Sequence, residues 1–275
     1  MECLQTGGAL KGNNLLYSAP TSAGKTLVAE ILTLKRILKT KRKAIFILPF
    51  VSVAREKMFS LRRLFAGLGV TVGGFMGAQT PPGGFKKVDI AVCTIERANS
   101  LINRLLESGN LSLVSVIVVD ELHMVGDSSR GCLLEPLLTK INFHAHLSAL
   151  DTEDDGDTSV QVIGMSATLP NLQVLSRWLK ADLYCTDFRP VPLTELVKIG
   201  TSMLDNKLEF VRDIQVPGVF ENDSEYIVNL CLETMQDGKS VLIFCPSKVW
   251  CEKLSLSIGK TTPNPMSSLE LVFGR

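Results

Sequence analysis

The sequence has little excess charge of either sign. Its 275 residues carry 29 Lys and Arg against 28 Asp and Glu, which gives a formal net charge of +1. A chain that attracts nucleic acid through a global positive field would be strongly basic, so any such site here must be local. Hydrophobic residues make up 45% of the chain, which is enough apolar material for a sizeable core.

Long apolar runs are also missing. No window holds 18 consecutive apolar residues, and the first residues do not show the basic-then-apolar order of a signal peptide. We therefore expect an intracellular, soluble protein without a membrane partner.

Cysteines are few and scattered. There are seven, none of them in a Cys-x-x-Cys pair, and several lie in apolar runs typical of strands. This pattern favours free thiols in a reducing compartment over a disulfide framework or a zinc site. The cysteines are Cys3, Cys93, Cys132, Cys185, Cys231, Cys245 and Cys251.

One loop carries a recognisable chemistry. Residues 19–26 read Ala-Pro-Thr-Ser-Ala-Gly-Lys-Thr, between an apolar run at 15–17 and an amphipathic run at 27–38. A strand, a small-residue loop and a helix together form a phosphate cradle, in which Lys25 reaches the β- and γ-phosphates and Thr26 offers its hydroxyl to Mg²⁺. The expected nucleotide-binding residues are Ala19, Pro20, Thr21, Ser22, Ala23, Gly24, Lys25 and Thr26.

The loop departs from the strict phosphate-binding pattern at its first position. Ala19 stands where Gly is usual, and Ala can follow the same backbone path unless φ must be positive. The alternative is an ordinary strand–turn–helix with a chance Gly-Lys-Thr, and the loop by itself leaves that alternative open.

A second motif supplies acidic groups. The β-branched run 116–119 is typical of a buried parallel strand, and Asp120, Glu121 and His123 follow it. Carboxylates at the carboxyl end of a central strand lie where open α/β sheets bind ligands. We expect Asp120 to bind Mg²⁺, Glu121 to orient and deprotonate a water, and His123 to face the coupling elements. A solvated acidic turn is the alternative, but chance seldom supplies both halves of one phosphoryl-transfer site.

Apolar strand-like runs alternate with helical patterns along the first part of the chain. This alternation predicts an α/β fold with a doubly wound parallel sheet. After a connection over residues 182–215, a helix, a strand and a second helix are predicted in turn. The first five strands are predicted at residues 14–17, 43–48, 89–94, 114–119 and 160–166, and the later elements at 226–235, 240–245 and 249–258.

Residues 150–159 form an acidic, glycine-containing insertion. We expect a solvated loop there, with a metal site involving His144 and His146 as the alternative.

The Gly-Lys-Thr loop and the Asp120-Glu121-Leu122-His123 segment resemble motifs I and II of superfamily 2 helicases. Ser166-Ala167-Thr168 resembles motif III. Four further segments are similar to parts of the same family, and the resemblance covers about residues 2–256. It implies a complete first RecA-like domain and the start of a second one. The four segments are 47–57 (motif Ia), 93–99 (motif Ib), 188–193 (a signature of the Ski2/Hel308-like branch) and 241–247 (motif IV).

The resemblance implies an ATP-dependent DNA helicase or translocase. Its cofactors would be ATP and Mg²⁺, and its partner single-stranded or forked DNA, in the nucleus, during double-strand break repair. Motif III, with Ser166, Ala167 and Thr168, would couple hydrolysis to the DNA-gripping surface; a plain strand-end turn is the alternative. The implied DNA contacts are Arg55, Lys57, Thr94 and Arg97; for Arg55 and Lys57 the alternative is a solvated basic helix face, over which their position after a strand favours the DNA role.

The resemblance also implies domain limits. Residues 1–195 would form the first RecA-like, ATP-binding domain, 196–224 a linker, 225–260 part of a second RecA-like domain, and 261–275 a divergent or disordered tail. No segment matches the family's Gln-x-x-Gly-Arg-Ala-Gly-Arg motif, whose arginine finger is worth about 10³–10⁵ in rate. We therefore expect a truncated isoform or incomplete gene model of a larger helicase–polymerase, with low activity alone. The alternatives are a non-catalytic ATP- and DNA-binding fragment and a Ski2-like RNA helicase.

Overall fold

The computed structural model describes residues 2–5, 7–21, 23–151, 159–167, 171–215, 223 and 225–261. The chain divides into two compact units, Met1–Val191 and Pro192–Arg275. A seven-stranded sheet forms the centre of the first unit, and the second contains a three-stranded sheet and two helices.

All neighbouring strands of the large sheet are parallel, which confirms the predicted α/β fold. The five strands predicted for this part of the sequence all form. Two more lie at the sheet edges, so the prediction that residue 182 already belongs to a connection was wrong. In spatial order the strands are β3 (Val72–Phe75), β4 (Ile90–Thr94), β2 (Lys43–Leu48), β5 (Val114–Val119), β6 (Gln161–Ser166), β1 (Asn14–Ser18) and β7 (Ala181–Cys185).

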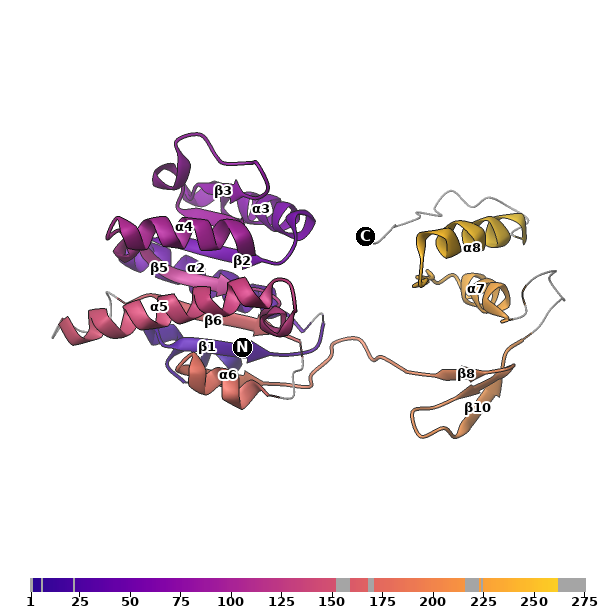
Figure 1. Ribbon diagram of the computed structural model, residues 1–275. Coiled ribbons are helices and arrows are strands. Elements are labelled where there is room, and N and C mark those ends of the chain that lie inside the picture. Colours follow the sequence, from indigo (N-terminus) through magenta and orange to yellow (C-terminus); the bar gives the residue numbers. More distant parts are fainter. Residues whose placement is uncertain are drawn as a thin grey trace. The chain divides into compact units, whose positions relative to one another are not determined.

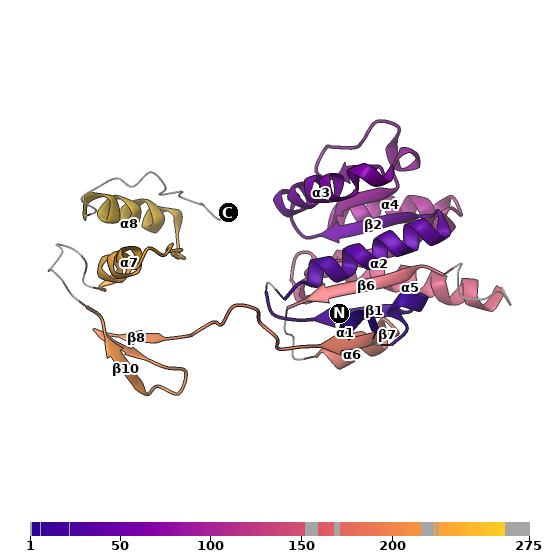
Figure 2. The same ribbon diagram turned by 180° about the vertical axis from the view of Figure 1, so that it is seen from behind.

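Helices cover both faces of this sheet, as Figures 1 and 2 show from opposite sides. The helices α2 (Lys25–Thr40) and α3 (Val51–Phe65) pack on one face. The helices α4 (Ile95–Glu107) and α5 (Gly131–Asp151) pack on the other, where α6 (Leu172–Trp178) adjoins β7. The short elements are α1 (Glu2–Gln5), η1 (Ala9–Lys11), η2 (Ala66–Leu68), η3 (Gly84–Lys87), η4 (Leu111–Leu113) and η5 (Leu122–Gly126).

Successive strand residues point to opposite faces and fill two separate cores. Ile45 and Ile117 belong to the core under α4 and α5, whereas Phe46 and Val118 belong to the core under α2 and α3. This two-sided burial explains why the central strands read as continuous apolar runs. Because all strands are parallel, the segments that follow β1, β2, β4, β5 and β6 meet at one carboxyl edge of the sheet.

In the second unit, part of the expected linker forms a sheet. The strands β8 (Val197–Ile199), β9 (Ser202–Leu204) and β10 (Phe210–Asp213) pair antiparallel. The helices α7 (Ile227–Gln236) and α8 (Lys248–Thr261) share a small core, and Arg212 Nη2 lies 2.7 Å from Glu233 Oε1. The domain limits and the second RecA-like domain remain predictions.

The strand predicted at 240–245 does not form. In the described part of the chain these residues pair with no neighbouring strand, and the Phe244 side chain is 89% exposed. A strand is stable only when adjoining strands satisfy its backbone groups, so the apolar pattern at 240–245 was not sufficient.

Several predictions fall outside the described residues. These are Ser22, Thr168, most of the acidic insertion (152–158) and nearly all of the tail (262–275), while residues 150 and 151 of the insertion continue α5. Within the described ranges, no group of three or more His, Cys, Asp or Glu side chains could hold a metal ion. None of the helices described there has the length and apolarity needed to cross a membrane.

Candidate nucleotide site and nucleic-acid interface

The Gly-Lys-Thr loop lies between β1 and α2, as a phosphate cradle requires. Gly24 precedes α2 with φ of 83°, a left-handed conformation that strains other residues. Ala19 is fully buried and does not have a positive φ, so its methyl group is compatible with the backbone path of the loop. The substitution of Gly by Ala at the first position therefore creates no backbone strain.

The Lys25 side chain lies across its own loop. Its ammonium donates hydrogen bonds to the carbonyl oxygens of Ala19 at 2.7 Å and Pro20 at 3.1 Å. These bonds hold the ammonium beside the backbone of the cradle, in front of the first turn of α2. Thr26 is exposed on that same turn.

Asp120 and Glu121 follow β5 at the same edge. The Asp120 N–H donates to the Ile47 carbonyl at 2.9 Å, which continues the ladder with β2. Burial raises the pKa of Asp120 and the nearby Glu121 carboxylate adds to this, whereas the Glu121 N–H and the ammonium groups of Lys57 and Lys25 act in the opposite direction. Lys25 and Asp120 are thus close enough for their charges to interact.

A single strand, β6, separates β1 from β5. The Ala19 N–H donates to the Ser166 carbonyl at 3.3 Å, and the Ser18 hydroxyl donates to the Ala167 carbonyl at 3.2 Å. The Ser166 hydroxyl is buried and has no hydrogen bond among the described residues. The end of β6 is therefore in direct contact with the cradle, where a coupling element would have to lie.

Glu121 and His123 lie beside each other. Glu121 adopts a left-handed conformation with φ of 51°, which turns the chain sharply after the strand. His123 Nδ1 lies 3.3 Å from Glu121 Oε2, although the described residues give this nitrogen no aligned hydrogen bond. Such a position beside the acid suits a residue that responds to changes at Glu121.

Lys57 is not where a DNA contact should be. Its side chain is 9% exposed, its ammonium lies 2.6 Å from Glu30 Oε1, and it sits over the Phe46 ring at 5.5 Å. A buried ammonium that already has a carboxylate partner is poorly placed to bind a DNA phosphate, so we withdraw Lys57 as a contact. Arg55 is exposed on the same helix.

The other two expected DNA contacts lie at the carboxyl edge of β4. Thr94 ends the strand and is buried, while the Arg97 guanidinium donates to the Thr80 hydroxyl at 2.6 Å. Three residues of this edge were not predicted as contacts: Arg130, and Phe50 and Glu96, each of which Arg130 contacts. Phe50 and Glu96 do lie in the segments 47–57 and 93–99 that resemble motifs Ia and Ib, but nothing in the sequence indicated that Arg130 would join them.

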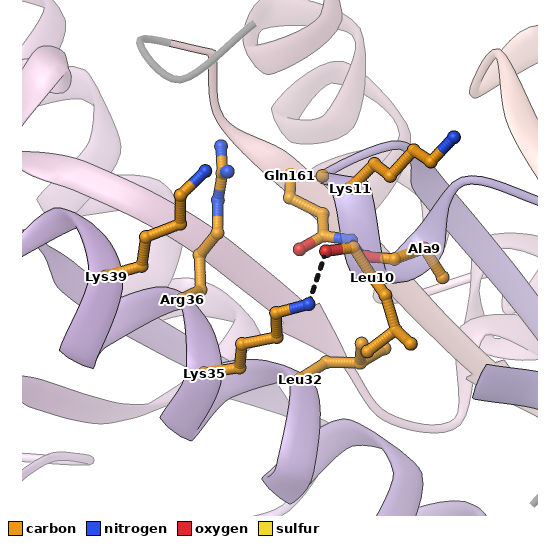
Figure 3. Close-up of a pocket in the computed structure, with 9 residues that line it drawn as sticks. Ala9, Leu10, Lys11, Leu32, Lys35, Arg36, Lys39 and Gln161 are labelled. Carbon is orange, nitrogen blue, oxygen red and sulfur yellow. Dashed lines mark hydrogen bonds between the residues drawn. The ribbon is translucent and has the colours of Figure 1, made fainter. Parts of the chain in front are cut away.

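A small basic cavity lies near the opposite end of α2 (Figure 3). Its volume is about 10 Å³, which suits one water molecule and not a nucleotide. The Lys35 ammonium donates to the Leu10 carbonyl at 2.8 Å inside it. The cavity is lined by Ala9, Leu10, Lys11, Gly12, Leu32, Lys35, Arg36, Lys39 and Gln161.

The chain is similar in sequence to one family of known proteins and to several individual relatives. The family model described as DEAD/DEAH box helicase matches residues 5–175. The chain is 58% identical over 257 residues to "DNA polymerase theta" of Mus musculus, covering 92% of this chain but 10% of that protein. It is 36% identical over 270 residues to "Helicase POLQ-like" of Homo sapiens, covering 94% and 23%. It is 30% identical over 252 residues to "ATP-dependent DNA helicase Hel308" of Methanocaldococcus jannaschii, covering 90% and 19%.

Proposed function

Because the chain belongs to the DEAD/DEAH box helicase family, we propose that it is an ATP-dependent DNA helicase or translocase module of the DNA polymerase theta type. The observation that carries this proposal is the convergence of Lys25 and Asp120 at one edge of the sheet, with β6 between their strands. The chain spans about a tenth of the length of the mouse relative, so the activity of the whole protein is part of the proposal.

The side chains at this edge fit Mg²⁺ and a triphosphate. Asp120 and Thr26 offer hard oxygen ligands, which Mg²⁺ prefers. Burial and the neighbouring Glu121 carboxylate disfavour the charged form of Asp120, and a bound Mg²⁺ would offset that cost. Mg²⁺ would neutralise charge on the phosphate oxygens.

In this proposal the chain's own groups divide the remaining work. Lys25 exchanges its bonds to Ala19 and Pro20 for the β- and γ-phosphate oxygens, while the loop N–H groups face the β-phosphate. Glu121 orients and deprotonates the attacking water, and His123 adjoins it. Ser166, Ala167 and Thr168 couple this site to the DNA-gripping surface.

We propose that Arg55, Thr94 and Arg97 contact phosphates and sugars of single-stranded DNA. Such contacts give sequence-independent binding whose affinity falls with salt. The names of the relatives are consistent with DNA as the substrate. A nuclear location, action on forked DNA and a role in double-strand break repair are the finer parts of the proposal.

We further propose that these 275 residues hydrolyse ATP slowly on their own. They contain no Gln-x-x-Gly-Arg-Ala-Gly-Arg segment to supply an arginine finger. Charge on the γ-phosphate would then be stabilised by Lys25, Mg²⁺ and backbone donors, at a loss of about 10³–10⁵ in rate.

A binding experiment tests the site independently of turnover. Titration of the 275-residue chain with a fluorescent ATP analogue and Mg²⁺ should show binding that Lys25→Ala abolishes. Lys35→Ala, on the same helix but at the far cavity, is the matched control and should bind as wild type does. Equal binding by wild type and Lys25→Ala would overturn the nucleotide site. Parallel titrations with oligo(dT) and oligo(U) distinguish a DNA module from an RNA module.

A further inference from the structure

Three segments that are distant in sequence meet at the carboxyl edge of the sheet. Phe50 follows β2, Glu96 lies in the first turn of α4 after β4, and Arg130 directly precedes α5. The Arg130 guanidinium carbon lies 4.7 Å from the centroid of the Phe50 ring, and Arg130 Nε lies 3.3 Å from Glu96 Oε1. We name these three residues the edge cluster.

The aromatic ring of the edge cluster is open to solvent. Phe50 is 46% exposed, although it sits at the end of a buried strand. Isolated exposed apolar residues are common on protein surfaces, so exposure alone indicates nothing. What distinguishes Phe50 is that a fixed cation stacks on its ring beside Glu96, whose neighbours Thr94 and Arg97 are the proposed phosphate contacts.

Arg130 is held in place from two sides. Its backbone N–H donates to Asp127 Oδ1 at 2.8 Å, and Ser129 donates to the same oxygen from its N–H at 2.9 Å and its hydroxyl at 2.6 Å. Its Nε is fixed by Glu96. A guanidinium ordered in this way loses little conformational entropy when it binds a ligand.

Glu96 keeps its negative charge near neutral pH. Desolvation acts to raise the pKa of Glu96, but hydrogen bonds from its own N–H, the Thr94 hydroxyl and Arg130 outweigh this and lower it. The described residues engage Arg130 through Nε, so its terminal N–H groups can reach a further acceptor.

From this geometry we propose that Phe50 and Arg130 form a platform on which one base of single-stranded DNA stacks, while the Arg130 guanidinium contacts an adjoining phosphate. The inference rests on the proposed function, because it adds a base contact to the backbone contacts of the same edge. Every base has a π-face, so a stacking platform is compatible with sequence-independent binding. The Phe50 ring and the Arg130 guanidinium both contribute to the platform. The face of a guanidinium stacks on aromatic groups, and its edge donates hydrogen bonds to phosphate.

The chain contains a matched control for this platform. Phe59, on α3, is 56% exposed and lies under Arg62, whose guanidinium carbon is 5.9 Å from the ring centroid. It is a second exposed Phe–Arg pair, but it lies within the helix and not at the end of a strand. Loss of its ring removes a similar amount of exposed apolar surface without touching the edge cluster.

The test measures oligo(dT) binding by fluorescence anisotropy with the 275-residue chain, after thermal melting has shown that each variant is folded. Phe50→Ala should weaken binding roughly 5- to 100-fold, while Phe59→Ala should bind as wild type does. Phe50→Trp should retain binding, because it keeps a stacking surface. On an oligonucleotide without bases, the difference between wild type and Phe50→Ala should disappear.

The Arg130 phosphate contact has its own readout. Arg130→Ala should reduce the slope of log affinity against log salt by about 0.7, whereas Phe50→Ala should leave the slope unchanged. Three results would overturn the platform but leave the proposed DNA function standing. They are wild-type affinity in Phe50→Ala, an equal loss of affinity in Phe59→Ala, and a loss in Phe50→Ala that persists on base-free DNA. Failure of the wild-type chain to bind any single-stranded DNA would overturn the proposed DNA function as well.

Discussion

Lys57 and Glu30 form an ion pair inside the first unit, with Nζ 2.6 Å from Oε1 and side chains only 9% and 12% exposed. The pair joins α3 to α2, and the Lys57 ammonium also lowers the pKa of Asp120 against the stronger effect of burial. The helix that starts at the Gly-Lys-Thr loop and the helix that follows β2 are therefore tied together near Asp120, the proposed Mg²⁺ ligand. A buried charge without its partner is strongly destabilising, so removal of either side chain would leave the other charge uncompensated.

Replacement of Lys57 by Met should destabilise the first unit strongly. The Glu30 carboxylate would remain in a largely buried position without its partner, at a cost of about 3–5 kcal/mol in the free energy of unfolding. Urea denaturation measures this directly. The double variant Lys57→Met/Glu30→Leu should recover most of the loss, whereas Lys239→Ala, at an exposed pair, should change stability by less than about 1 kcal/mol. No recovery in the double variant would contradict this account.

Glu96 should make a pH-dependent contribution to stability. Its pKa is lowered in the folded chain, so its contribution is present above the ordinary value of 4.5 and is lost as the pH falls through the folded value. Glu96→Gln should therefore lower stability by about 0.2–1 kcal/mol at pH 7, and the difference should shrink below pH 4.5. Thermal melting across pH measures it. Glu107→Gln makes the same chemical change at an exposed position of the same helix and serves as the comparison variant.

Gly24→Ala should impair the cradle more than the fold. The φ of 83° at this position is unfavourable for Ala by about 1–2 kcal/mol, although an added methyl group would meet no atom within 4 Å. The loop would relieve this strain by changing its backbone path, and Mg-ATP binding should weaken. Gly67→Ala also adds a methyl group in open space, but without a positive φ, and should be neutral in both melting and nucleotide titration.

Gly164→Ala should displace the segment after the acid pair. A methyl group on Gly164 would lie 2.8 Å from Leu122 Cδ2 and 3.2 Å from Leu16 Cδ1, inside a fully buried layer. Such overpacking costs about 1–3 kcal/mol, measurable by denaturation. Leu122→Ala removes the closest atom, so the two substitutions together should cost less than the sum of their separate effects. Simple additivity would show that the two residues do not compete for space.

The sheet and the cradle could be predicted because their signals are local. Continuous β-branched runs between helical patterns fix the central strands, and parallel topology brings the segments after β1 and β5 to one edge. The edge strands were missed for local reasons too. Gly73 and Gly74 weaken the strand pattern of β3, and Asp182 interrupts the apolar run of β7.

Lys57 was misassigned although the sequence held a signal against its exposure. Ala54, Met58, Leu61 and Phe65 form the buried stripe of α3, and Lys57 falls on that stripe at helical spacing. Its partner Glu30 lies on another helix, and no local pattern could identify it. The edge cluster was hidden for the same reason, since Phe50, Glu96 and Arg130 meet only after the sheet has formed.

The placement of β6 between β1 and β5 has one more consequence. Neighbouring strands are held about 4.8 Å apart by backbone hydrogen bonds, so the ends of β1 and β5 are separated by about 10 Å. Backbone hydrogen bonds therefore set the spacing of the strands that carry the Gly-Lys-Thr loop and Asp120, and this spacing does not depend on side chains elsewhere. Substitutions at the proposed DNA contacts can therefore occur without changing the spacing of the two segments that carry the proposed nucleotide site.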